Sequence, residues 1–313
     1  MTTAHHVFDD LSRARLLIVS GKGGVGRTTV AAMLGLACAR RDARVLVGTT
    51  GTDDRLAWML GRPTLDAEPR EAATNLFVQR FDPQTCIVEY GGMMAGPTLS
   101  KLVLDNGAVR RFLRALPGLD DYAVLGKAWH EATRGGRYDV VVLDGPATGH
   151  LRYVLGVPSA IVETVPSGVL SAEARRIDEA LRDDRITRTV YVGLAEPWPL
   201  SELAELAESL EGELGIAFGA AFVNGLWPAC TLPGKAPADL DPLRVALDRA
   251  CGRGRAQRSV LRQARGLRSP VVGIDWHFGG IEGPEDLAHL LERARMLDVA
   301  HDGAGDLSRR PSP

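Results

Sequence analysis

Short apolar runs recur along this chain, and helical segments separate most of them. Runs that are apolar at consecutive positions are typical of strands that are buried on both faces. Because strands and helices alternate, we predict an α/β fold with a doubly wound, mostly parallel sheet covered by helices on both sides. The predicted strands are Leu16–Val19, Val45–Val47, Leu76–Phe81, Val140–Leu143, Thr189–Gly193, Ala220–Val223 and Val271–Ile274.

The segment of about 82–137 interrupts this alternation because it reads entirely as helix and turn. Within it, an apolar stripe from Leu99 to Leu116 has helical spacing, which leaves open whether the stripe packs inside the segment or binds a client protein. We therefore expect a sheet domain over 13–295 with an inserted helical lobe. Residues 1–12 and 297–313 are expected to be disordered tails, the latter because it is rich in Pro, Gly and Asp.

The composition is that of an ordinary soluble globular protein, with 313 residues, 45% hydrophobic residues and a formal net charge of -2. It does not point to nucleic acid or to a membrane surface as a partner. No stretch approaches the roughly 18 consecutive apolar residues of a membrane span, and Met1–Asp10 lacks a hydrophobic signal core. We therefore expect a cytoplasmic protein without an integral membrane segment.

The four cysteines are scattered, and no two of them form a C-x-x-C pair. This spacing does not favour zinc or iron–sulfur chemistry, so we expect inert free thiols. The cysteines are Cys38, Cys86, Cys230 and Cys251.

A glycine-rich stretch near the N-terminus fits the phosphate-loop pattern G-x-x-x-x-G-K-[S/T], except that Arg27 replaces the lysine. A predicted strand precedes it and an Ala- and Leu-rich helix follows, so its N–H groups and the helix N-terminus would converge on phosphate. Thr28 is the expected magnesium ligand, and Thr29 is placed to reach an inner phosphate oxygen. The predicted loop residues are Gly21, Lys22, Gly23, Gly24, Val25, Gly26, Arg27, Thr28 and Thr29.

A second motif lies at the end of the strand predicted at Val140–Leu143, where the acid Asp144 follows the apolar run. This is the form of a Walker B element, whose acid holds a water on the magnesium at the carboxyl edge of the sheet. The two motifs together predict a phosphate-loop nucleotide-binding protein that uses ATP and Mg²⁺.

The string D-x-P-A-T-G-H at 144–150, together with K-G-G-V-G at 22–26, resembles the arsenite-pump and tail-anchored-protein-targeting ATPases. These are anion-transporting ATPase-like proteins with a deviant Walker A loop, in which a lysine directly follows the first glycine. Val223-Asn224 resembles their adenine-contacting V-N pair. Pro117–Asp121 and Leu125–Trp129 resemble segments of bacterial paralogues that often occur as encoded pairs. The resemblance extends from Leu16 to about Leu290.

The resemblance implies a dimer in which Lys22 reaches the nucleotide of the partner; the alternative for Lys22 is a solvated loop lysine. It implies that Gly145 and Pro146 lie beside the γ-phosphate and that His150 transmits the nucleotide state to the helical lobe. A structural hydrogen bond is the alternative for His150. Asn224 is implied to contact adenine, or else it is an ordinary polar residue at a strand end.

Two departures from the family pattern affect the expected chemistry. Where the family has T-D-P-A, this chain has Gly48–Leu56, with Thr50 or Gly51 at the position of the water-orienting acid. Whether Asp53 serves from a shifted loop is open. At Arg27, a planar guanidinium cannot reproduce a compact ammonium. Losing the lysine's bonds would forfeit about 1.5–3 kcal/mol, or roughly ten- to hundredfold in rate.

The sequence therefore predicts an ATPase that couples Mg²⁺ and ATP to a conformational switch in a dimer, with Arg27, Lys22 and Asp144 as its catalytic residues. The alternative is a catalytically weak, nucleotide-binding regulatory subunit that forms a heterodimer with an active paralogue. The family's C-x-x-C zinc pair and its methionine-rich client-binding helices are absent from the sequence. No motif identifies the client.

Overall fold

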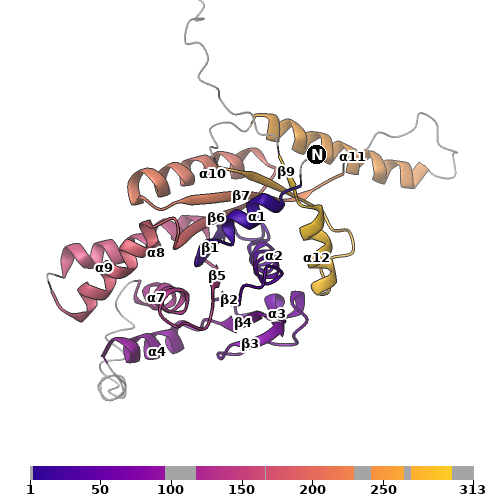
Figure 1. Cartoon of the computed structure of the whole chain (residues 1–313). Helices are drawn as coiled ribbons and strands as arrows, with labels where there is room; N and C mark the ends of the chain where they lie inside the picture. Colours follow the sequence, from indigo (N-terminus) through magenta and orange to yellow (C-terminus); the bar gives the residue numbers. More distant parts are fainter. Residues whose placement is uncertain (1–2, 96–117, 166, 229–240, 264–268, 298–313) are drawn as a thin grey trace, which may run out of the picture.

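The computed structural model describes residues 3–95, 118–165, 167–228, 241–263 and 269–297. Its described part contains a nine-stranded sheet in the order β3-β4-β2-β5-β1-β6-β7-β8-β9 (Figure 1). Strand pairs from β4 to β8 are parallel, and the edge strands β3 and β9 pair antiparallel with their neighbours. The predicted fold, an α/β protein with a doubly wound and mostly parallel sheet, is confirmed.

Each apolar run that was predicted to be a strand forms one. The central strands β1, β2 and β5 are buried at every position, as expected for a sheet covered on both faces. The sequence did not reveal β3, whose residues are mostly exposed, or β9, which has only two residues. The strands are β1 (Leu16–Gly21), β2 (Val45–Thr49), β3 (Arg70–Ala73), β4 (Leu76–Arg80), β5 (Val140–Asp144), β6 (Thr187–Leu194), β7 (Phe218–Leu226), β8 (Val271–Asp275) and β9 (Arg295–Met296).

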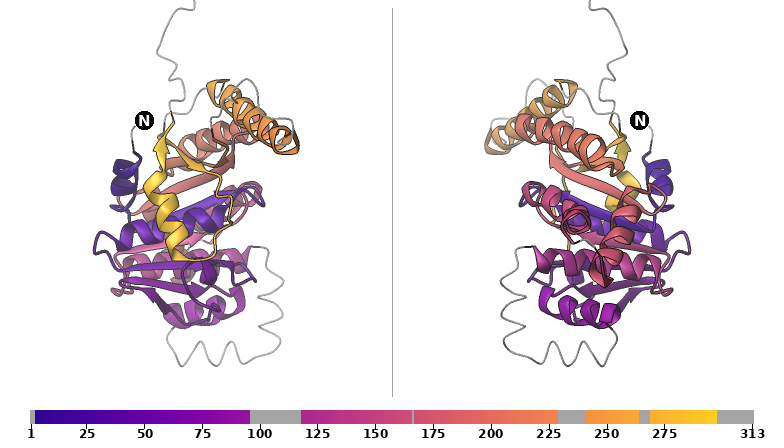
Figure 2. Two further views of the ribbon diagram at one scale, coloured as in Figure 1. Left: turned by 90° about the vertical axis from the view of Figure 1, so that its right-hand side faces the viewer. Right: turned by 90° about the vertical axis from the view of Figure 1, so that its left-hand side faces the viewer.

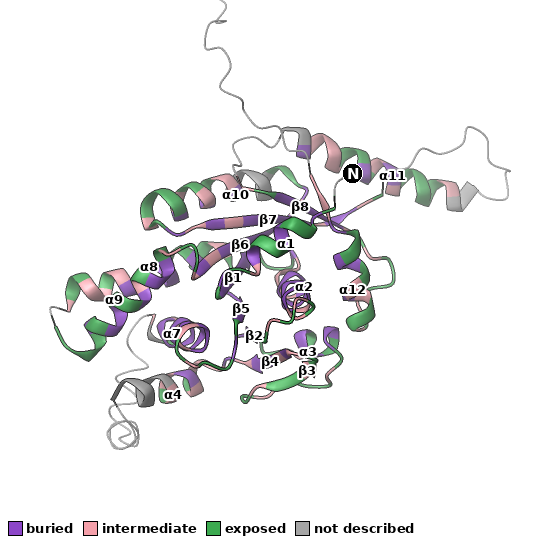
Figure 3. Cartoon of the chain, viewed as in Figure 1, coloured by how far each residue is buried: buried purple, intermediate pink, exposed green. Residues whose placement is uncertain are grey.

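Helices cover both faces of the sheet and form a separate apolar core on each. One core lies between the sheet and α1, α2, α3 and α12, and the other is formed with α7, α8, α9 and α10 (Figures 1 and 3). Helices α4 and α11 lie toward opposite ends of the molecule (Figure 2). The helices are α1 (His5–Leu11), α2 (Arg27–Ala39), α3 (Arg55–Met59), α4 (Pro83–Ala95), α7 (Leu119–Thr133), α8 (Thr148–Thr164), α9 (Val169–Arg182), α10 (Pro197–Ser209) with a π-helical turn η1 (Leu210–Leu214), α11 (Asp241–Gln263) and α12 (Pro284–Arg293).

The N-terminal segment corrects one prediction. Residues 1–12 were expected to be a disordered tail, but α1 forms within them and buries Val7, Phe8 and Leu11. The Phe8 ring lies 5.6 Å from that of Phe222 on β7, between ring centroids. Three apolar side chains on one helical face were enough to dock this short helix on the sheet.

The predicted helical lobe contains α4 and α7, which pack against each other. Lys127 of α7 is buried and pairs with Glu89 of α4. The apolar stripe Leu99–Leu116 falls within 96–117 and lies outside the described residues, as do 229–240 and 298–313. Among the helices that the structure describes, none is long and apolar enough to cross a bilayer.

The expectation that the cysteines are inert free thiols holds for only some of those that the structure describes. Cys38 and Cys86 are buried free thiols, and burial raises the pKa of each to about 12. Such thiols stay protonated and unreactive at neutral pH. The expectation was wrong for Cys251, which takes part in a disulfide bond.

Candidate functional site

The candidate site forms where three neighbouring parallel strands end. In the sheet register Asp144 of β5 lies beside Val19 of β1 on one side and Thr49 of β2 on the other. The glycine-rich loop follows β1 directly. Because parallel strands end at the same edge, the loop, Asp144 and the segment after β2 converge there, as ligand sites do in open α/β sheets.

Left-handed backbone angles or close packing explain three glycines of the loop. Gly24 and Gly26 have φ angles of 81° and 95°, in the left-handed region that favours glycine. A Cβ atom on Gly26 would overlap Asn224 Nδ2, and one on Gly21 would overlap the carbonyl oxygen of Val192 on β6. As the N-cap of α2, Gly26 also brings no side chain that could bond the N–H groups of the first turn. Those N–H groups are thus available to an anion.

Asn224 of β7 holds this loop from the protein side. Its Nδ2 donates to the carbonyl of Val25 at 2.9 Å, and its Oδ1 accepts from the N–H of Gly225 at 2.9 Å. Asn224 therefore supports the loop. The sequence did not indicate this role, because the contact joins the loop after β1 to a residue of β7. Its predicted contact with adenine stays a prediction.

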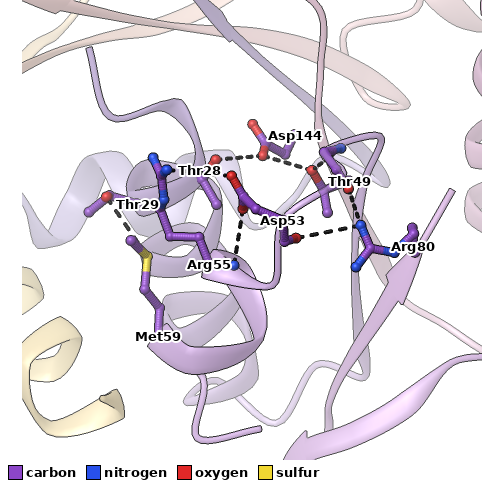
Figure 4. Close-up of polar contacts among 9 residues, drawn as sticks. Thr28, Thr29, Thr49, Asp53, Arg55, Met59, Arg80 and Asp144 are labelled. Atoms are coloured by element: carbon purple, nitrogen blue, oxygen red, sulfur yellow. Dashed lines mark hydrogen bonds and ion pairs between the residues drawn. The ribbon is translucent and has the colours of Figure 1, made fainter. Parts of the chain in front are cut away.

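Asp144 is the buried polar centre of the site (Figure 4). One of its carboxylate oxygens, Oδ2, accepts hydrogen bonds from the hydroxyls of Thr28 at 2.8 Å and Thr49 at 2.9 Å. Only 6% of the residue is exposed. Burial raises the pKa of Asp144, and the two hydroxyl bonds and the charge of Arg27 offset part of that rise.

The residues at this point fit a magnesium ion. Thr28 and Asp144 offer hard oxygen donors of the kind that Mg²⁺ prefers, and two protein ligands suit an ion that keeps several of its waters. A buried carboxylate with a raised pKa would also gain a compensating charge. The structure thus joins the two predicted metal ligands, although Thr49, their third partner, was not predicted.

A cavity of about 370 Å³ opens over this centre. Three segments of chain enclose it: the loop with the start of α2, the segment after β2, and the segment after β5. The lining residues are Gly24, Gly26, Arg27, Thr28, Thr29, Thr49, Thr50, Gly51, Asp53, Arg55, Leu56, Asp144, Gly145, Pro146 and Ala147.

Some predicted site residues do not line the cavity. Gly21 and Val25 pack inside the protein, and an added Cβ on Gly23 would meet no atom within 4 Å. Lys22 leaves the loop and pairs with Glu202 of α10, with Nζ and Oε1 2.6 Å apart. Since about half of the Lys22 side chain is exposed, this pair is a surface contact that other partners can displace.

The loop is also tied to the segment after β5. Arg27 Nη1 donates to the carbonyl of Gly145 at 2.8 Å, and Ser20 Oγ donates to that of Pro146 at 2.7 Å. Gly145 donates its own N–H to Val19 at 2.9 Å. The arginine that replaces the expected lysine therefore makes a bond to the protein backbone across the site.

Two neighbouring acids in the segment after β2, Asp53 and Asp54, make different contacts. Asp54 accepts hydrogen bonds from the N–H of Leu65 at 2.9 Å and from Arg80 of β4 at 2.8 Å, so it fixes the loop. Arg80 also donates to the carbonyl of Gly51. Asp53 instead lines the cavity, where its charge raises the pKa of Asp144. The Asp53 carboxylate thus lies at the cavity, although positions 50 and 51 of the same segment carry no acid.

His150 links the segment after β5 to α7. Its Nε2 lies 2.8 Å from Asp121 Oδ2 at the start of α7, and its ring stacks on Tyr153 with centroids 5.3 Å apart. His150 is in the first turn of α8, which follows the Gly145-Pro146 segment. The contact is consistent with a structural hydrogen bond and with signal transmission alike.

The fold and the site define a phosphate-loop nucleotide-binding protein. A sequence model of the anion-transporting ATPase family matches residues 14–167. The match extends over about half of the chain, so the chain is similar to this family there, and the similarity supports a nucleotide-binding phosphate-loop ATPase.

Individual relatives agree with this assignment. ATPase BagA of Mycobacterium tuberculosis is 28% identical over 258 residues, which cover 76% of this chain and 74% of that protein. An arsenical pump-driving ATPase of Acidiphilium multivorum is 26% identical over 74% of this chain and 42% of its own length. An ATPase ASNA1 homolog of Dictyostelium discoideum is 27% identical over 48% and 43%.

Gly26→Ala is expected to destabilise the protein, because the new Cβ would overlap Asn224 Nδ2 and force a left-handed angle on alanine. In an Asn224→Ala background the overlap is gone, and only the backbone strain of about 1–2 kcal/mol should remain. Urea unfolding of the two single variants and the double variant measures this coupling. Gly156→Ala on α8, where a Cβ meets nothing within 4 Å, is the control. Additive effects of the two substitutions would contradict the packing explanation.

Asp144→Asn is expected to stabilise the protein when nucleotide and metal are absent. Burial raises the folded-state pKa of Asp144, so the folded protein binds this proton more tightly than the unfolded chain. Stability from this group is therefore full below the unfolded pKa near 3.9 and is lost as the pH rises through the higher folded pKa.

Thermal unfolding of wild type and Asp144→Asn from about pH 4 to about pH 8 checks this sign. The wild-type midpoint should fall relative to the variant as pH rises. Adding Mg²⁺ and ATP should raise the midpoint of wild type and leave that of the variant nearly unchanged. Parallel pH profiles would show that Asp144 is not perturbed as described.

Proposed function

We propose that this chain binds ATP with Mg²⁺ in the cavity over Asp144 and hydrolyses it slowly. The observation that carries the proposal is the convergence of three elements on one cavity: a glycine loop at a helix N-terminus, the Thr28–Asp144 pair and a loop that presents Asp53. Backbone N–H groups of the loop and of the first turn of α2 would bind the phosphates.

The proposed reaction is attack of water on the terminal phosphate. Thr28 and Asp144 would hold a magnesium ion, which when bound supplies positive charge to the phosphate oxygens. Asp53 is the proposed group that orients the water, because its carboxylate lines the cavity and the family's acid position carries Thr50 or Gly51. Arg27 supplies a positive charge but is less suited than lysine to a phosphate enclosed by the loop.

A second cavity of about 370 Å³ at the same edge of the sheet suits the nucleoside end of the ligand. Its walls come from the ends of β6 and β7 and from Trp276 just after β8, and α11 closes it with Gln257. Trp276 stacks on Trp227 with centroids 5.8 Å apart. A nucleobase would find an aromatic wall there next to polar partners.

We further propose that nucleotide drives a two-position switch in a dimer, with Lys22 released from Glu202 to reach the partner's nucleotide. The names of the relatives support ATP-driven work without identifying a client for this chain. The contact of His150 with Asp121 gives the segment after β5 a direct connection to α7, where a client or partner would respond.

One observation favours the second function, a nucleotide-binding regulatory subunit in a heterodimer. Arg27 is bonded to the carbonyl of Gly145, so the group that should stabilise the transferring phosphoryl already has a backbone partner. Such a chain would bind nucleotide and leave hydrolysis to an active paralogue. The proposals differ in whether the purified chain turns over ATP.

Steady-state ATP turnover tests the proposed function. Wild type is expected to show slow turnover that requires Mg²⁺, and Asp144→Asn should abolish it. Arg27→Lys is expected to raise the rate roughly ten- to hundredfold, because an ammonium recovers about 1.5–3 kcal/mol of charge-assisted bonding. Nucleotide binding is measured separately for each variant. Tight binding without turnover, restored neither by lysine nor by more protein, would reject the enzyme and favour the regulatory subunit.

Trp276→Ala is expected to weaken ATP binding about tenfold, since base stacking on an aromatic ring is worth roughly 1–3 kcal/mol. The affinity for inorganic tripolyphosphate, which lacks the base, should not change. Calorimetric titration with both ligands gives the comparison. Trp58→Ala is the control, because Trp58 is an exposed tryptophan that does not line this cavity. Equal losses for ATP and tripolyphosphate would place the base elsewhere.

A further inference from the structure

A second arginine, Arg55, faces the phosphate cavity and is not explained by the motifs. It is the first residue of α3 and lines the cavity together with Thr28 and Thr29. Its side chain extends from α3 toward these threonines in Figure 4. The guanidinium Nη2 lies 3.4 Å from Asp53 Oδ2, and more than 60% of each side chain is exposed.

The ion pair between Arg55 and Asp53 is not what holds this segment in place. Exposed pairs of this length contribute little to folding. The turn is kept instead by the backbone N–H of Arg55, which donates to Asp53 Oδ1 at 3.1 Å, and by the contacts of Asp54 with Leu65 and Arg80. The guanidinium can therefore change partner without loss of the loop.

The other cationic groups near the loop already have partners. Arg27 donates to Gly145, and Lys22 pairs with Glu202 outside the cavity. Among the described lining residues, Arg27 and Arg55 are the cationic ones. An incoming triphosphate has several negative charges, and a guanidinium fork binds phosphate oxygens in pairs.

We propose that Arg55 binds the terminal phosphate of ATP and gives up Asp53 to do so. This proposal rests on the proposed function of the same cavity. Because the bond between Arg55 and Asp53 breaks when the phosphate binds, the Asp53 carboxylate becomes free to orient water only while a third phosphate is present. ADP lacks this phosphate, so with ADP the arginine remains on Asp53.

The chemical step then balances as an ordinary hydrolysis. The water oxygen forms a bond to the γ-phosphorus while the bond from this phosphorus to the β–γ bridging oxygen breaks. ADP leaves with the electron pair of that bond, and the proton of the water passes to solvent. Arg55 stabilises the charge on the transferring group as an arginine supplied within the same chain.

Equilibrium binding of ATPγS and ADP, both with Mg²⁺, tests the proposal apart from turnover. Arg55→Ala is expected to weaken ATPγS about tenfold or more and to change ADP by less than about twofold, as loss of a charge-assisted bond to one phosphate requires. Asp53→Asn should have the opposite effect and tighten ATPγS, because the arginine loses its competing partner. Arg55→Lys should recover part of the affinity.

The control is Arg70→Ala, since Arg70 is also an exposed arginine paired with a carboxylate, Asp66, but lies on β3 away from the cavity. It should leave both affinities unchanged. Equal losses of ATPγS and ADP in Arg55→Ala, or no loss at all, would overturn the proposal. So would weaker ATPγS binding in Asp53→Asn. If wild type binds neither nucleotide, the proposed function itself fails, which is a distinguishable result.

Discussion

The site depends on a carboxylate that is kept in a place where its charge is poorly solvated. Asp144 is at the end of the central strand β5, with β1 and β2 on either side, and it keeps two hydroxyl partners, Thr28 and Thr49. Burial opposes ionisation there. Each element that meets this carboxylate is consequently fixed in position: the first turn of α2, the end of β2 and the segment that starts at Gly145. A bound cation would offset the unfavourable free energy of burying the Asp144 charge.

Replacing the loop lysine with Arg27 changes more than one contact. A longer, planar side chain reaches across the site to the carbonyl of Gly145 and joins the phosphate loop to the segment after β5. The same region presents Asp53 and Arg55 from the loop after β2, which Arg80 and Asp54 hold rigidly. The two departures from the family pattern therefore both line one cavity. This arrangement fits the proposal that the positive charge for the terminal phosphate comes from Arg55 at the start of α3 and not from the loop.

Much of the fold was predictable from sequence because buried parallel strands are apolar at every position, and the glycine loop and Asp144 follow two of them directly. Elements with weak local patterns were missed: β3 and β9 are short edge strands, and α1 depends on tertiary contacts such as that of Phe8 with Phe222 on β7. Within the site, the partners of Asn224 and Lys22 depend on tertiary contacts with other elements, and spacing within a motif does not encode them. Thr49 was detectable in principle, as a hydroxyl at the end of a strand beside β5.

The same contacts suggest how the occupied cavity would act on the rest of the protein. Bound nucleotide phosphates would compete for Arg27, and its release would free the carbonyl of Gly145. Gly145 lies five residues before His150 in a segment that leads into α8. Pro146 stays attached to the loop strand through Ser20 Oγ, so movement would concentrate beyond it, at the first turn of α8. That turn holds Asp121 of α7 through His150. In the proposed switch, a change of partner at one arginine would become a displacement between two helices, to which a partner protein would respond.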